Sequence, residues 1–145
     1  MMEVATVAAD VLPVPERDVD SEPFWAALDE KRLLLQCCSA CDRFRFPAMS
    51  RCPYCTGPRS EWRELSGRGT VYSWIVVRQA FWPQFAGEVP YALVTVDLAE
   101  GVRVVGRMDD IDALDFGRSV DVVYVEHPEW TEFRFAVSAP AENMG

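Results

Sequence analysis

The sequence lacks most of the residues and motifs that carry catalysis. Histidine occurs once, as His127, next to a proline in a predicted connection between strands, and no acid–base partner for it is identifiable. No serine stands in the strand–turn–helix setting of a nucleophile elbow, and there is no phosphate-binding glycine motif. We therefore expect no catalysis by this chain alone.

Long apolar runs are also missing. No stretch approaches the roughly 18 apolar residues of a membrane span. Residues 1–22 carry six acidic residues against the single Arg17, unlike a secretory signal or an Arg-rich transit peptide. The expectation is a cytoplasmic protein, and a chain of 145 residues is usually one domain with a core of its own.

Basic charge is scarce outside one segment. The formal net charge is −9, to which residues 1–28 contribute −5, residues 29–66 contribute +2 and residues 67–145 contribute −6. Nucleic-acid affinity depends mainly on neutralising phosphates, so the acidic C-terminal part is poorly suited to bind DNA or RNA.

Four of the five cysteines form two Cys-x-x-Cys pairs, Cys38 with Cys41 and Cys52 with Cys55. This spacing is typical of one tetrahedral Zn²⁺ site, whereas a redox role would require a βαβ context that is absent. Four thiolates close the coordination sphere, so we expect a structural metal that binds neither substrate nor water. Cys37 is the fifth thiol. Its spacing to Cys41 makes Cys38 the better ligand, although an exchange of register between these two neighbours stays open.

The pattern before residue 67 predicts a tail, a helix and a metal-bound lobe. Residues 1–20 form an acidic tail without periodicity, which we expect to be disordered, and Ser21 is a candidate cap for a short helix over residues 21–31. Short alternating runs around the cysteines predict a zinc ribbon over residues 32–66. So small a lobe buries little apolar area, and metal binding, on the order of 10–16 kcal/mol in peptide-sized sites, is expected to replace a core.

The pattern after residue 67 is β throughout. Strands are expected at residues 71–77, 91–98, 102–108, 120–125 and 132–137. With a short helix near residues 109–114, this is the order of elements in an OB-fold, a small Greek-key barrel, over residues 67–138. A generic small barrel or sandwich is the alternative. Gly67-Arg68-Gly69 is interpreted as a hinge, and residues 139–145 are expected to be a flexible C-terminus.

Some aromatic residues lie where exposure is expected. Phe24 and Trp25 of the short helix either pack on the ribbon or barrel, or dock into another subunit. The connection between the first two barrel strands contains Phe81, Trp82 and Phe85. These three either cover an end of the barrel or contact a ligand or partner, as loops on rigid scaffolds commonly do.

Several motifs together resemble those of a known family. They are Pro23-Phe24-Trp25, Cys38-x-x-Cys41 with Pro47, Cys52-Pro53-x-Cys55, the run from Ser66 to Trp74, and Pro90-Tyr91. The family comprises small proteins with an N-terminal helix, a rubredoxin-like zinc ribbon and a C-terminal OB-fold, long catalogued as a domain of unknown function and found beside thiolase-like genes. The resemblance runs from about residue 23 to residue 137.

The resemblance implies a non-catalytic accessory role in acyl-CoA chemistry. Family members look like partners of thiolase-like enzymes in acyl transfer, Claisen-type condensation or retro-aldol cleavage of CoA esters, as in steroid side-chain degradation. Some pair instead with enoyl-CoA hydratases of the hot-dog fold. The expected ligands are structural Zn²⁺ and acyl-CoA, and the expected partner is a thiolase-like enzyme in a hetero-oligomer.

Candidate contact residues for such a role come from all three parts of the chain. They are Phe24, Trp25, Arg43, Arg45, Trp74, Phe81, Trp82 and Phe85. The ribbon arginines, which also include Arg51 and Arg59, either face CoA phosphates or an acidic partner, or form a solvated charged face. A single-stranded nucleic-acid module, suggested by analogy for a ribbon joined to an OB-fold, is the remaining alternative.

Overall fold

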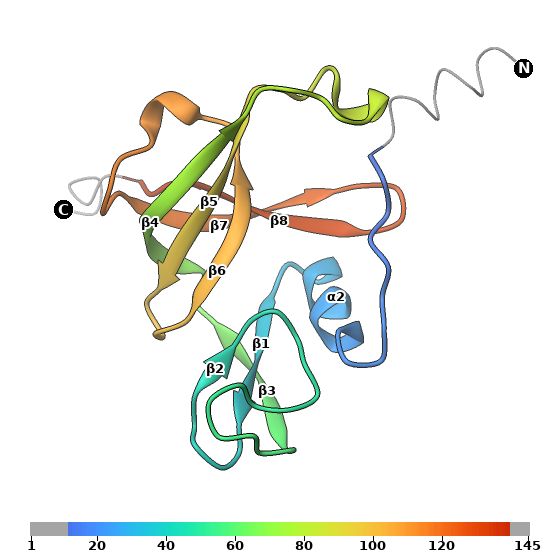
Figure 1. The fold of residues 1–145 in the computed structure, drawn as a ribbon, viewed down its shortest axis with the longest axis vertical. Helices are drawn as coiled ribbons and strands as arrows, with labels where there is room; N and C mark the ends of the chain where they lie inside the picture. The colour runs from blue at the N-terminus through green and yellow to red at the C-terminus, as the bar shows by residue number, and fades with distance from the viewer. Residues whose placement is uncertain (1–11, 140–145) are drawn as a thin grey trace, which may run out of the picture.

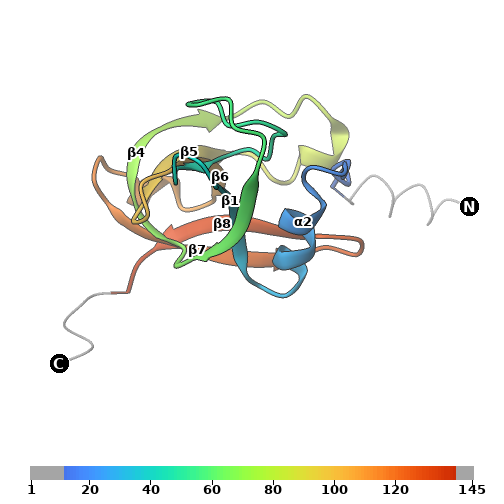
Figure 2. The same cartoon turned by 90° about the horizontal axis from the view of Figure 1, so that it is seen from below.

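A small sheet around the cysteines lies below a closed five-stranded barrel in the computed structural model, which describes residues 12–139 of the chain (Figure 1). A short helix, α2 (Glu22–Asp29), packs beside both, as the view from below also shows (Figure 2). The predicted mainly β fold, with an N-terminal helix, a zinc ribbon and an OB-type barrel, is confirmed.

Strand bounds follow the predicted runs closely. The small sheet contains β1 (Leu33–Cys38), β2 (Phe44–Arg45) and β3 (Ser60–Leu65), in the order β2-β1-β3. The barrel contains β4 (Arg68–Val77), β5 (Tyr91–Leu98), β6 (Arg103–Met108), β7 (Ser119–Glu126) and β8 (Thr131–Val137). Two 3₁₀ turns, η1 (Pro83–Phe85) and η2 (Ile111–Ala113), lie in the connections after β4 and β6.

The barrel strands are arranged as β4-β5-β6-β8-β7, and β7 pairs back onto β4 to close the sheet. The pairing of β6 with β8 is parallel and the other pairings are antiparallel. Strict alternation in β5 buries every second side chain, from Ala92 to Leu98, because successive residues of a strand point to opposite faces. The helix expected between the third and fourth barrel strands is the short 3₁₀ turn η2.

The helix begins after Ser21, its predicted cap residue, but it differs from the prediction in the bonds of that cap and in where it ends. We had expected the Ser21 hydroxyl to make a cap bond, but the structure has none. Instead, the Ser21 N–H donates to Oδ1 of Asp18 at 2.8 Å. The Ser21 hydroxyl accepts the indole N–H of Trp25 at 3.2 Å. At the other end Lys31 has a φ of 58°, a left-handed conformation that an α-helix cannot continue through.

One core runs through all three parts. Phe24 of α2, Phe46 of the ribbon and Phe133 of β8 pack edge to face, with ring centroids 6.0–6.1 Å apart. Leu33 and Leu35 of β1 belong to the same buried cluster as the barrel valines. The ribbon was expected to have little core besides its metal. Its inner face shares the core of the barrel instead, because α2 packs on both β1 and β8 and because Phe46 packs on Phe133.

The expected hinge is confined to one residue. Gly67 has a φ of 81°, which favours glycine, whereas Arg68 already begins β4. Gly69 lies inside that strand, where a Cβ atom would come within 2.6 Å of the backbone oxygen of Asp97. Gly69 therefore allows β4 and β5 to lie close together, and the hinge predicted for residues 67–69 is not formed at this position.

The described part of the predicted tail follows a defined path. Residues 12–20 run from the region of η1 past the tip of the β7–β8 hairpin to α2 (Figures 1 and 2). Arg17 pairs with Glu22 at 3.2 Å and with Asp29 at 3.3 Å, which holds this segment against the helix. Residues 1–11 and 140–145, part of the expected mobile ends, lie outside the described residues. In the described range, no helix has the length and apolar character needed to cross a membrane.

Candidate functional site

The four paired cysteines converge at the end of the ribbon, and their Sγ atoms all lie within 4.8 Å of one another. The Sγ atoms of Cys38 and Cys55 are 3.6 Å apart, as are those of Cys41 and Cys52. With Zn–S bonds of about 2.3 Å, a tetrahedral site has sulfur–sulfur separations of about 3.8 Å. The arrangement fits one Zn²⁺ bound by four thiolates.

Each turn prepares its first cysteine for ionisation. The backbone N–H groups of Cys41 and Ala40 donate to Sγ of Cys38, at 3.5 and 3.4 Å, and these bonds lower the pKa of the Cys38 thiol to about 6. The N–H of Tyr54 donates to Sγ of Cys52 in the same way, at 3.4 Å. Thiolates are the form that binds zinc, so the turns favour the ligand state before any metal arrives.

Cys37 does not join this cluster. Its side chain is buried on β1, and its Sγ lies 3.6 Å from Oδ1 of Asp42. Burial raises the pKa of this thiol, the opposite direction from Cys38. The register exchange left open by the sequence is therefore not seen, and the four-thiolate set leaves no open position for substrate.

Two of the candidate contact residues have internal roles. Phe24 is 7% exposed and packs in the shared core. Of the two predicted alternatives, it therefore packs within the chain and does not dock into another subunit. Arg45 is 2% exposed; its Nε donates to the side-chain oxygen of Gln36 at 3.0 Å and its Nη2 donates to the Met49 carbonyl at 3.1 Å. Neither side chain is available to a CoA phosphate or a partner in the folded chain.

Three candidates are half-buried. Trp25 packs edge to face on Trp130, with ring centroids 6.0 Å apart. Trp74 lies 4.9 Å from the ring of the exposed Phe116. Phe85 turns inward toward Tyr91, at 6.2 Å between centroids, and so covers part of the barrel.

The remaining candidates project into solvent. Phe81 and Trp82 are 77% and 62% exposed, at the tip of the connection between β4 and β5. Arg43 is exposed on the ribbon, with its guanidinium carbon 4.9 Å from the ring centroid of Tyr54. Of the two possibilities left open for the loop, Phe85 covers the barrel whereas Phe81 and Trp82 leave a large aromatic surface uncovered.

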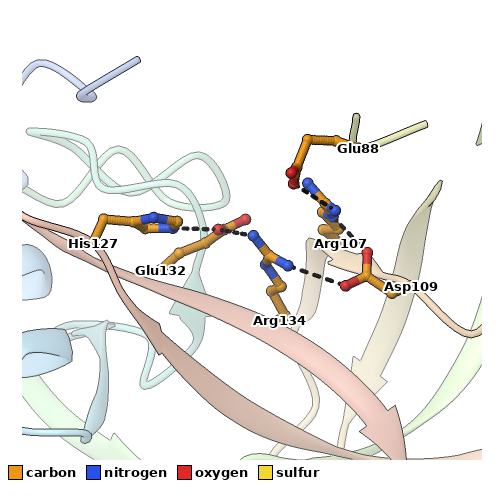
Figure 3. Close-up of polar contacts among 6 residues, drawn as sticks. All are labelled: Glu88, Arg107, Asp109, His127, Glu132 and Arg134. Atoms are coloured by element: carbon orange, nitrogen blue, oxygen red, sulfur yellow. Dashed lines mark hydrogen bonds and ion pairs between the residues drawn. The ribbon is translucent and has the colours of Figure 1, made fainter. Parts of the chain in front are cut away.

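A chain of ion pairs on the barrel was missed by sequence reasoning. Its members are Glu88, Arg107, Asp109, His127, Glu132 and Arg134 (Figure 3). Nε2 of His127 lies 2.9 Å from Oε1 of Glu132, so the histidine that lacked an identifiable partner has one. The members come from β6, β8 and three connections, and only the closed barrel brings them together. Charged residues within predicted strands, such as Arg107 and Arg134, were the available hint.

The zinc ribbon and the barrel each match a known domain. Residues 25–61 match the rubredoxin-like zinc ribbon domain of ChsH2, and residues 62–125 match its C-terminal OB-fold domain. A solved structure described as an Ltp2–ChsH2(DUF35) aldolase superposes with a TM-score of 0.76 and 32% identity, over 87% of this chain and 100% of that chain.

Curated relatives carry names from acyl-CoA metabolism or from scaffold proteins. The chain is 34% identical over 133 residues to a probable enoyl-CoA hydratase alpha subunit of Thermomonospora curvata, matching 90% of this chain but only 41% of that protein. It is 33% identical over 72 residues to the benzoylsuccinyl-CoA thiolase subunit BbsA of Thauera aromatica, covering 50% and 48% of the two chains.

An archaeal relative of similar size completes the comparison. The chain is 33% identical over 106 residues to a DUF35 domain-containing scaffold protein of Methanocaldococcus jannaschii, which covers 69% of this chain and 73% of that protein. With a ribbon of four converging cysteines, an OB-type barrel and these matches, the chain belongs to the DUF35 family of ChsH2-type proteins.

Proposed function

We propose that this chain is a non-catalytic accessory subunit of a thiolase-like enzyme that acts on CoA esters by acyl transfer, condensation or retro-aldol cleavage. The observation that carries the proposal is the aromatic tip formed by Phe81 and Trp82, which is exposed on a rigid barrel. Aromatic side chains are enriched at protein interfaces, where a few of them supply most of the binding energy. The thiolate cluster, closed by four sulfurs, serves as a structural staple of the ribbon.

The names of the relatives support this role. One relative is called a scaffold protein, one a thiolase subunit, and the matching solved structure is an aldolase described with two named components. The hydratase name supports the alternative of a hydratase subunit less well. The chain matches only 41% of that protein, and most of the named protein has no counterpart here.

We further propose that the exposed ribbon arginines contribute to acyl-CoA binding or to an acidic partner surface. Arg43, Arg51 and Arg59 are all exposed, whereas Arg45 is withdrawn into the ribbon. A guanidinium group binds phosphate oxygens through paired hydrogen bonds, which suits the phosphates of CoA. Steroid or other lipid side chains are the proposed source of the acyl group, on the strength of the family resemblance.

Co-expression with a thiolase-fold enzyme of the same organism tests the proposal. We expect the two chains to elute together, and we expect turnover of a CoA ester by the pair but not by this chain alone. The Trp82→Ala variant should weaken the complex on the order of tenfold or more, because a buried aromatic anchor commonly contributes over 2 kcal/mol. Val105→Ser on β6, a matched change of an exposed apolar residue outside the loop, is the control. Separate elution of the unaltered pair, with no gain in activity, would contradict the proposal.

A further inference from the structure

A cavity of about 320 Å³ lies on the barrel between the N-terminal segment and strands β5, β6 and β8. OB-folds bind their ligands on the face of the second and third strands, between the loops that follow the first and fourth. Here β5 and β6 are those strands, and Phe85 and Trp130 come from those two loops. The cavity therefore occupies the ligand-binding face of this fold, remote from the cysteine cluster.

The walls of the cavity are mostly apolar. They include Leu12, Val14, Phe85 and Leu93. The volume is at the lower end of the roughly 300–1,000 Å³ typical of small-molecule sites. A ligand of the size of a medium-length alkyl chain would fill it.

One polar atom in the cavity wall lacks a partner. The indole N–H of Trp130 is buried and has no acceptor among residues 12–139. A buried donor without an acceptor is unfavourable, so a ligand oxygen that reaches this atom once the wall around it opens would gain a hydrogen bond. The indole ring itself is fixed, because it stacks on His127 at 4.6 Å between centroids and packs against Trp25.

The charged groups of the cavity favour a neutral ligand. Arg107 lines it, but this guanidinium is already paired with Glu88 at 2.9 Å and with Asp109 at 2.7 Å. Glu132 also lines it and has its own pairs with His127 and Arg134. A ligand carboxylate would find no free cation in the described walls and would face the Glu132 carboxylate, whereas a ketone or ester oxygen would not be repelled.

The outer wall is the least firmly attached. Residues 12–15 form it, and two of these four residues are prolines, which cannot donate a backbone hydrogen bond. Within the described chain, no hydrogen bond joins residues 12–16 to the barrel; the nearest anchor is Arg17, which holds the helix rather than a strand. This wall can leave the barrel without breaking a strand pairing.

We propose that this cavity binds a neutral apolar molecule that carries a carbonyl oxygen, and that residues 12–15 are the wall that moves to admit it. The carbonyl oxygen accepts the Trp130 indole N–H, and the alkyl part lies between Phe85, Leu93 and the N-terminal segment. An acyl thioester is one member of this ligand class. The site is nevertheless formed by this chain alone, so it does not depend on the proposed partner.

A titration of the zinc-loaded, ¹⁵N-labelled full chain with 2-nonanone tests the site. We expect the indole N–H resonance of Trp130 to move downfield and to saturate. The backbone N–H resonances of Leu12 and Val14 should follow the same binding curve. Nonanoate, the matched carboxylate, should bind on the order of tenfold more weakly, as a repulsion of about 1.4 kcal/mol from the Glu132 carboxylate predicts.

The Trp130→Phe variant separates the hydrogen bond from simple apolar filling. It should bind 2-nonanone about tenfold more weakly, while Trp62→Phe, a matched change on β3 away from the cavity, should bind like the parent. Absence of a saturable shift at Trp130 in the unaltered chain would overturn the proposal whether or not the variants fold. So would equal ketone affinity in a folded Trp130→Phe protein, or saturation at Trp130 with no change at Leu12 and Val14.

Discussion

Phe24 of α2 and Phe133 of β8 pack edge to face, with ring centroids 6.0 Å apart and ring planes at 88°. Phe46 of the ribbon touches both rings, at 6.0 and 6.1 Å. Three aromatic rings thus join the helix, the ribbon and the barrel at one point. The relative position of the ribbon and the barrel is therefore fixed by packing.

Truncation of Phe24 should therefore loosen the whole molecule. Phe24→Ala is expected to lower the free energy of unfolding by about 3 kcal/mol, because buried aromatic residues truncated to alanine lose both apolar burial and packing contacts. Denaturant unfolding followed by fluorescence measures this. Phe81→Ala, at a site 77% exposed, is the control and should change stability by less than about 0.5 kcal/mol. Equal effects of the two changes would contradict the shared core.

The cysteine geometry predicts which thiols hold metal. The unaltered chain and Cys37→Ala should each retain about one zinc ion per chain, whereas Cys38→Ala should lose it, because three thiolates and an unsatisfied position bind far more weakly. Metal analysis after gel filtration measures the ratio. A strong chelator should lower the melting temperature of the parent as it removes the metal. Zinc retained by Cys38→Ala but lost from Cys37→Ala would overturn the assignment.

The buried Arg107 of the ion-pair chain should contribute more to the free energy of unfolding than Arg103, whose ion pair is exposed. Arg107 is 9% exposed, and its guanidinium lies 4.4 Å from the ring centroid of Tyr91. Arg103 also lies over an aromatic ring, that of Tyr72 at 3.5 Å, but it is 54% exposed and has a single ion pair, with Asp97. Arg107→Met is expected to cost about 1–3 kcal/mol, since Glu88 loses its cation and Asp109 is left with Arg134 alone. Arg103→Met should cost clearly less, because its ion pair is exposed to solvent. Thermal unfolding of both variants checks the ranking, which a larger loss in Arg103→Met would reverse.

Tyr124 should make the free energy of unfolding fall as the pH rises above 10. Burial raises the pKa of this phenol above its usual value near 10, and the Glu64 carboxylate raises it further. The unfolded chain then ionises first, so the stabilising contribution is complete below pH 10 and is lost as the pH rises through the folded pKa. Tyr124→Phe should flatten the loss of stability above pH 10, and the last tyrosinate to appear at 295 nm should be missing. Loss of a tyrosinate that appears at or below pH 10, with the last one to appear still present, would contradict the direction of the shift.

Local patterns were enough to predict the elements that depend on neighbours in sequence. The alternation in residues 91–98 gave β5, and the two Cys-x-x-Cys pairs gave the converging thiolates, because each signal is contained in a few consecutive residues. The order of five strands with a short helical turn was enough to predict an OB-type barrel. Ser21 is the N-cap residue, as predicted, but its hydroxyl makes no cap bond and accepts the indole N–H of Trp25 instead.

Features that depend on distant contacts were not predictable in the same way. Arg45 alternates with apolar residues as an exposed strand residue would. It is nevertheless buried, because its guanidinium donates to the side chain of Gln36 on the neighbouring strand. The partner of His127 lies across a hairpin whose register no local pattern fixes. The path of residues 12–15 is also invisible in sequence, since it depends on an apolar face that exists only after the barrel closes.

The aromatic tip and the family membership together make partner binding the central claim. Native mass spectrometry of this chain purified after co-expression with a thiolase-fold enzyme of the same organism tests it most directly. We predict one assembly containing both chains, which is weakened when Trp82 is replaced by alanine and retained when Val105 is replaced by serine. Only separate masses for the two unaltered chains, across the concentrations at which each stays folded, would contradict the claim.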